Sequence, residues 1–180
     1  MKMKFQLLAM MVIAALAFSA CGDDDKNDGI TVPDAVSKAL KNKYPAATDI
    51  EWERKGDYFV ADCWMDGKEM DVWYDTQAVW RLTEVDILWG RPGRSRDDRL
   101  CLQLPWVQTA FEGGEYANWK REDIDMLEYP VQPVQYVIEV EKGNLEYQLF
   151  YAEDGALLQQ RDVSGDKDDT HWPIDKKVAE

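Results

Sequence analysis

Hydrophobic and polar residues alternate on both sides of Asp66-Gly67, a dipeptide typical of two-residue β-hairpin turns. A hairpin centred on this turn places every second residue of its two strands on one face. That face is apolar and consists of three cross-strand pairs: Cys63 with Met70, Ala61 with Val72, and Phe59 with Tyr74. Because a shift of one residue would move all these side chains to the other face, the pattern predicts both the hairpin and its register.

The same alternation appears again in the second half of the chain, around Gly143-Asn144. A hairpin centred there gives a second apolar face in the same register: Val140 with Tyr147, Ile138 with Leu149, and Tyr136 with Tyr151. Self-similarity of this kind indicates that one structural unit is repeated. We therefore expect residues 31–87 and 104–163 to be two copies of one unit.

Each unit opens with a predicted helix, marked by apolar residues at i, i+3 and i+4. These stripes are Val36, Ala39 and Leu40 in the first copy and Val107, Ala110 and Phe111 in the second. Tyr44-Pro45 and Gly113-Gly114 end the two helices. A first strand that carries Ile50 and Trp52 and a fourth strand over residues 79–85 complete the first unit. The predicted fold class is α+β, a tandem repeat of a helix packed on a four-stranded antiparallel sheet.

The opposite face of the first hairpin mixes tryptophans with acids. The register sets Trp64 opposite Glu69 and Asp62 opposite Asp71, and like charges directly across a ladder are unfavourable when buried. We therefore expect an open face, on which large aromatic side chains would supply binding energy. The candidate binding surface consists of Tyr58, Asp62, Trp64, Glu69, Asp71 and Trp73. The alternative is that the other unit, or the loop between the units, covers both tryptophans.

The N-terminus is typical of an exported lipoprotein. Residues 1–20 combine a basic start, an apolar stretch and a small-residue cleavage site, which is the pattern of a secretory signal peptide. Cys21 follows directly and resembles the lipidated cysteine of bacterial lipoproteins; the alternative is an ordinary signal with a chance cysteine. Residues 21–30 form an acidic tether similar to a surface-export signal. We expect an outer-membrane lipoprotein at the cell surface, with the periplasmic face as the alternative.

Composition and charge disfavour several classes of partner and of chemistry. The 180 residues include 35 Asp and Glu against 21 Lys and Arg, for a net charge of −14 and a pI near 4.5. Such a charge disfavours nucleic acid as a partner and leaves the lipid anchor as the only predicted membrane contact. The chain has one histidine, His171, and lacks the common hydrolase, phosphate-loop and zinc-protease motifs. We predict no catalytic residues, no metal and no cofactor.

Two further cysteines remain once Cys21 is lipidated. Cys63 and Cys101 are a candidate disulfide, because exported proteins fold in an oxidising compartment. The alternative is that Cys63 is an ordinary core residue, since its counterpart in the second copy is Val140 and a buried cysteine behaves as a small hydrophobe.

The first copy carries a specific family resemblance. Its motifs are Lys43-Tyr44-Pro45-Ala46, Ile50-Glu51-Trp52, residues 67–75 and Thr83-Glu84-Val85-Asp86. They resemble the PepSY-like, or beta-lactamase-inhibitor-like, family of exported Gram-negative proteins, over about residues 31–163. The resemblance implies tandem helix-and-sheet repeats without known catalytic residues. Similarity to beta-lactamase inhibitory protein implies a concave sheet surface that grips a protein.

The linker departs from the family pattern because it is longer. Residues 88–103 contain four arginines, Arg91, Arg94, Arg96 and Arg99. This basic segment would either dock an anionic group or be a solvated loop. Residues 164–180 are expected to be an acidic tail.

The predicted function is that of a non-enzymatic, lipid-anchored envelope protein whose sheet surface binds a protein or peptide, with inhibition of an enzyme as one form of that binding. The alternative is a carbohydrate-binding accessory lipoprotein, because exposed tryptophans also stack on sugar rings. A third reading, an enzyme, would require a deep pocket with converging carboxylates.

Overall fold

The computed structural model describes residues 26–27, 30–87 and 104–165. The helices are α1 (Asp34–Lys43) and α3 (Pro105–Glu112). The strands are β1 (Lys26–Asn27), β2 (Thr48–Lys55), β3 (Tyr58–Met65), β4 (Lys68–Asp75), β5 (Trp80–Asp86), β6 (Lys120–Glu128), β7 (Gln135–Lys142), β8 (Leu145–Ala152) and β9 (Leu157–Asp162). Among the described residues, neither helix is long and apolar enough to cross a membrane.

The two predicted helices are confirmed at nearly the expected residues. Helix α1 starts directly after Pro33 and carries an acid in its first turn and lysines in its last, which complements the helix dipole. Its apolar stripe is buried through Val36 and Leu40, as that of α3 is through Val107 and Phe111. The helices therefore pack on the sheet along the stripes that the sequence predicts.

The registers of both hairpins are confirmed. In β3 and β4, Cys63 pairs with Met70 and Ala61 with Val72, and in β7 and β8, Val140 pairs with Tyr147. The residues at the first turn, Asp66 and Gly67, both have positive φ, as a two-residue turn of this kind requires.

The predicted fold class, a tandem repeat of a helix on a four-stranded sheet, is wrong. The described strands form one continuous sheet in the order β1 to β9, antiparallel throughout except for the short β1. Strands β5 and β6 join the two halves through the pairs Thr83–Glu128, Glu84–Leu127, Val85–Met126 and Asp86–Asp125. Two separate sheets would leave β5 and β6 as unpaired edges, and this pairing satisfies their backbone groups.

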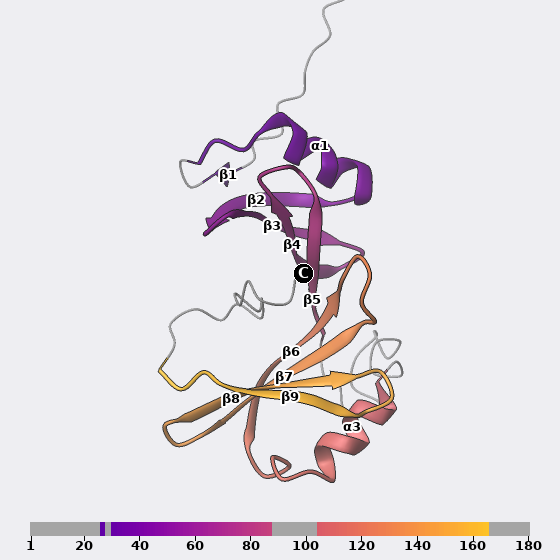
Figure 1. Cartoon of the computed structure of the whole chain (residues 1–180), viewed down its shortest axis with the longest axis vertical. Helices are drawn as coiled ribbons and strands as arrows, with labels where there is room; N and C mark the ends of the chain where they lie inside the picture. Colours follow the sequence, from indigo (N-terminus) through magenta and orange to yellow (C-terminus); the bar gives the residue numbers. More distant parts are fainter. Residues whose placement is uncertain (1–25, 28–29, 88–103, 166–180) are drawn as a thin grey trace, which may run out of the picture.

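Both helices cover the same face of this sheet, at opposite ends of the molecule (Figure 1). Helix α1 packs over a core that includes Trp52, Phe59 and Tyr74, and α3 packs over one that includes Ile138 and Leu149. Met126 of β6 contacts both cores. The face away from the helices is turned toward the middle of the molecule (Figure 1), and we call it the inner face.

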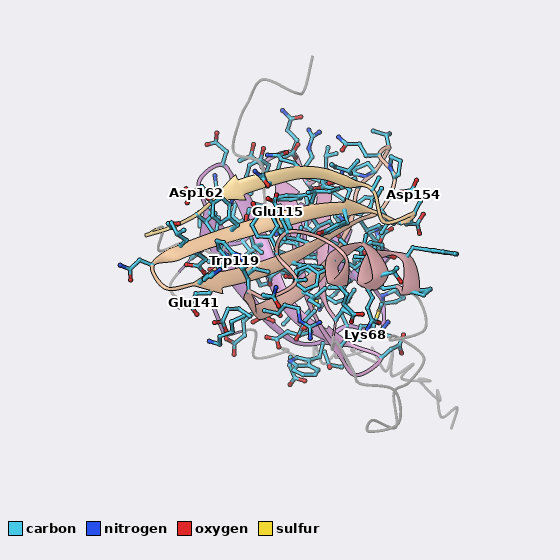
Figure 2. All side chains as sticks on the ribbon, turned by 90° about the horizontal axis from the view of Figure 1, so that it is seen from below. Lys68, Glu115, Trp119, Glu141, Asp154 and Asp162 are labelled. Carbon is cyan, nitrogen blue, oxygen red and sulfur yellow. The ribbon has the colours of Figure 1, made fainter. Side chains whose placement is uncertain are left out.

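Figure 2 looks at the molecule from the α3 end and places Glu115 and Trp119 there, after the helix. The ring of Trp119 contacts Tyr116 and Tyr147, with ring centroids 5.2 and 5.6 Å away. This aromatic cluster extends the core beyond the short helix.

Candidate functional site

The six residues of the candidate binding surface all belong to the inner face. In the β3–β4 ladder, Tyr58 pairs with Asp75, Asp62 with Asp71, and Trp64 with Glu69, while Trp73 pairs with Val60. These are the alternate positions to the pairs that face α1. The sequence therefore places these side chains on one face of one hairpin, although their exposure differs.

Trp73 lies in the floor of the inner face, where its side chain is 2% exposed. Its indole N–H donates to Glu84 Oε2 at 3.3 Å, and the edge of its ring contacts Tyr58, with centroids 6.0 Å apart. The same cluster contains Val60 and Leu82 of the first half and Leu127, Val137 and Phe150 of the second. Trp73 is therefore buried among side chains of both halves. Its ring joins the two halves and is not available to a partner.

Trp64 is placed differently, because 43% of its side chain is exposed. It lies near the β3–β4 turn, at the edge of the inner face, and its cross-strand neighbour Glu69 is also exposed. Of the two tryptophans that the sequence assigned to this face, only Trp64 is available for contact.

Carboxylates form a line across four neighbouring strands of the inner face. Glu51 of β2 pairs with Asp62 of β3, Asp62 with Asp71 of β4, and Asp71 with Glu84 of β5. We call Glu51, Asp62, Asp71 and Glu84 the acidic row. Like charges in directly paired positions repel each other, and Lys55 of β2 offsets part of this repulsion at Asp62 and Asp71.

The protonation equilibria of this face reflect that crowding. Burial raises the pKa of Asp71 to about 7, against a lowering by Lys55 and with a further rise from Asp62. Burial also raises the pKa of Asp62, and Glu69 and Glu51 add to the rise. The inner face therefore holds acids whose ionisation is unfavourable in the folded protein.

The negative charge extends beyond the acidic row onto β5 and β6. Asp86 pairs with Asp125 across the junction of the two halves. Burial raises the pKa of Asp86, and Asp123 and Asp125 raise it further. The face is thus acidic on both sides of the junction.

Sequence reasoning missed Glu51, Glu84, Asp86 and Asp125. Glu51 could have been predicted from the sequence. It is next to Trp52 in a predicted strand, and neighbouring residues of a strand point to opposite faces of the sheet. Glu84, Asp86 and Asp125 join this face only through the pairing of β5 with β4 and β6. The sequence has no short turn between β5 and β6 that would predict the pairing of these two strands.

Comparison with solved structures identifies relatives of the chain. A BLIP-like protein from Bacteroides fragilis is 41% identical in sequence, with a TM-score of 0.68, and the match covers 81% of this chain and 96% of that one. This chain belongs to the BLIP-like family. A DUF2874 family protein from Bacteroides ovatus is 32% identical, with a TM-score of 0.67, and covers 78% of this BLIP-like chain and 94% of its own length.

A third relative comes from Bacteroides eggerthii and is described as a putative periplasmic protein. It is 26% identical, with a TM-score of 0.63, over 75% of this chain and 91% of its own. No protein-family model and no curated protein matches the chain. The BLIP-like part of the family resemblance is therefore confirmed, and the PepSY-like name stays a prediction.

Other predicted sites of this BLIP-like chain lie in part or entirely outside the described residues. Cys63 is buried in the core beneath α1, and burial raises the pKa of its thiol to about 12. Cys101, its predicted disulfide partner, lies outside the described residues, as do the signal peptide, Cys21, the linker arginines and His171. Among the described residues, no group of three or more His, Cys, Asp or Glu side chains is arranged to hold a metal ion.

Proposed function

We propose that this BLIP-like chain is a binding protein of the cell envelope whose inner face grips a protein partner with a basic surface. The observation that carries the proposal is the acidic row, in which Glu51 is exposed and Asp62 and Asp71 are half-buried on the same face as the exposed Trp64. Its fourth member, Glu84, is buried. Both helices pack on the opposite face of the sheet.

A basic partner fits this face for an electrostatic reason. Asp62, Asp71 and Asp86 have raised pKa values because they are buried beside other acids. Lysine or arginine side chains from a partner would offset that repulsion and would speed association through charge complementarity. The BLIP-like family name supports one form of such binding, the inhibition of an enzyme, which would require no catalytic residues in this chain.

The envelope location rests on two supports. The N-terminus carries the pattern of a lipoprotein signal with Cys21 at its cleavage site, and the relative from Bacteroides eggerthii has a name that proposes the periplasm. We propose attachment to the outer membrane through the lipid on Cys21, with the fold at the cell surface.

Carbohydrate binding has weaker support. It relied on Trp64 and Trp73 as two exposed rings for sugar stacking, and Trp73 is 2% exposed. A single ring beside several carboxylates favours a cationic protein partner over a neutral glycan.

The first prediction concerns partner capture from a native envelope extract. We expect Glu69→Gln/Asp71→Asn to lower capture of the partner about tenfold, because two carboxylates that would face basic side chains are lost. The bound proteins are identified by mass spectrometry at low and at high salt, and the difference should shrink at high salt.

The matched control for this capture experiment is Asp34→Asn/Glu115→Gln. It removes the same number of negative charges from α1 and from the segment after α3, away from the inner face. This variant should capture the partner as the wild type does. Identical bound proteins for the wild type and the inner-face variant would contradict the proposed function.

A further inference from the structure

A hollow of about 370 Å³ opens beside Trp64 at the edge of the inner face. It lies between the start of β2 and the β3–β4 turn, and its walls are Ala46, Thr48, Asp49, Trp64, Met65, Asp66 and Gly67. The volume is at the lower end of the range that binding sites for small groups occupy. One aromatic ring and two carboxylates thus line the same depression.

Both aspartates of the hollow lie at irregular positions of the backbone, where φ is positive. Asp66 has φ of 55° because it occupies the first position of the hairpin turn. Asp49 has φ of 52° and lies where the β2–β3 register shifts between Thr48 and Glu51. Such a bulge adds a residue to one strand and redirects its side chains. Both side chains are exposed.

The charged groups of the hollow have no partners among the described residues. Asp49, Asp66 and the neighbouring Glu69 take part in no ion pair or side-chain hydrogen bond within the part of the chain that the structure describes. The nearest lysine along the turn, Lys68, pairs across the ladder with Met65 in the wall of the hollow, and it forms no ion pair with Asp49 or Asp66 within the described residues. The hollow therefore carries carboxylates that no described cation neutralises.

Three other tryptophans of this protein have a lysine over the ring. Lysine ammonium groups lie over the rings of Trp80, Trp73 and Trp119, at 3.4, 5.5 and 5.7 Å from the ring. By contrast, no lysine or arginine side chain among the described residues lies over the ring of Trp64. Its face is thus open to a cation from another molecule, and tryptophan is the best aromatic partner for one.

We propose that this hollow receives a single arginine side chain of the protein partner. The guanidinium group would stack on Trp64 while its N–H groups donate to Asp49 and Asp66. Arginine suits the site better than lysine, because its planar group stacks on aromatic rings and its donors bind two acceptors at once. The inference rests on the proposed function for the identity of the partner, and its test requires no partner.

The test uses a small probe, Nα-acetyl-arginine methylamide, titrated into the ¹⁵N-labelled protein. We expect the indole N–H signal of Trp64 to shift saturably, while the neutral citrulline analogue shifts it far less at equal concentration. Asp49→Asn/Asp66→Asn should weaken binding of the arginine probe about two- to tenfold, because two charge-assisted contacts become neutral. In Trp64→Ala and Trp64→Phe, which lack this indole, the backbone N–H signals of Asp66 and Gly67 in the wall of the hollow report binding. Trp64→Ala should abolish their saturable shifts, and Trp64→Phe should restore part of them.

The matched control is Trp106→Ala, which removes another exposed tryptophan, on α3 and outside the hollow. It should leave the titration unchanged. Equal shifts with the arginine and citrulline probes, or full binding in Asp49→Asn/Asp66→Asn, would overturn the inference. If the arginine-specific shift is absent but Glu69→Gln/Asp71→Asn still lowers partner capture, only this site is rejected. If the shift is present but Glu69→Gln/Asp71→Asn captures the partner as the wild type does, only the proposed function is rejected.

Discussion

Trp73→Ala is expected to lower the free energy of unfolding by about 3–5 kcal/mol, the range for removing a buried tryptophan from a core. The substitution empties the centre of a cluster that includes Leu82 of the first half and Phe150 of the second. It also removes the indole N–H that donates to Glu84. Urea-induced unfolding, followed by far-UV circular dichroism, measures the change.

Two exposed tryptophans serve as controls for this substitution. Trp64→Ala and Trp106→Ala should each change the free energy of unfolding by less than about 1 kcal/mol, because their side chains are 43% and 67% exposed. Trp73→Phe should fall between the wild type and Trp73→Ala, since it keeps most of the apolar contact. If Trp73→Ala were as stable as Trp64→Ala, the inner-face cluster would not join the two halves.

Asp71→Asn is expected to stabilise the protein at pH 8 by about 1–3 kcal/mol and to change little at pH 4. An unfolded aspartate ionises near pH 4, whereas burial raises the pKa of Asp71 in the folded protein to about 7. The folded state therefore binds this proton more tightly than the unfolded chain. Its contribution to stability is present at pH 4 and is lost as the pH rises through 7.

The measurement is the free energy of unfolding of the wild type and of Asp71→Asn at pH 4, 6 and 8. The difference between them isolates Asp71 from the other titrating groups. The control Asp34→Asn removes an exposed carboxylate from the first turn of α1, where it complements the helix dipole, so this variant should not be more stable than the wild type at pH 8. A constant difference between Asp71→Asn and wild type across this range would contradict the crowding of acids on the inner face.

The hairpins were predictable because strand alternation has a strict two-residue period. Once Asp66-Gly67 marked the turn, the pairing of Cys63 with Met70 followed, and so did the separation of Trp64 and Asp71 onto the other face. The helices were predictable for the equivalent reason, because the stripe at Val36 and Leu40 has the helical period. Each of these features is encoded within a short stretch of chain.

The single sheet was not predictable from the same patterns. The β5–β6 pairs mix polar and apolar residues, as in Glu84 with Leu127, and no turn fixes their register. The burial of Trp73 depends on that junction, because Leu127 and Val137 enter its cluster only when β6 lies beside β5. Long-range pairing therefore decides both the architecture and which tryptophan remains available for contact.

The central claim is that the inner face contacts the partner, and crosslinking in living cells tests it most directly. Thr48 and Thr109 are a matched pair of exposed threonines whose hydroxyls bind backbone carbonyls, the first on the inner-face side and the second on α3. Photoreactive benzoylphenylalanine would replace each in turn in the full-length protein. We predict a discrete crosslinked protein from position 48 and none from position 109. Crosslinking from position 109 with none from position 48 would contradict the claim.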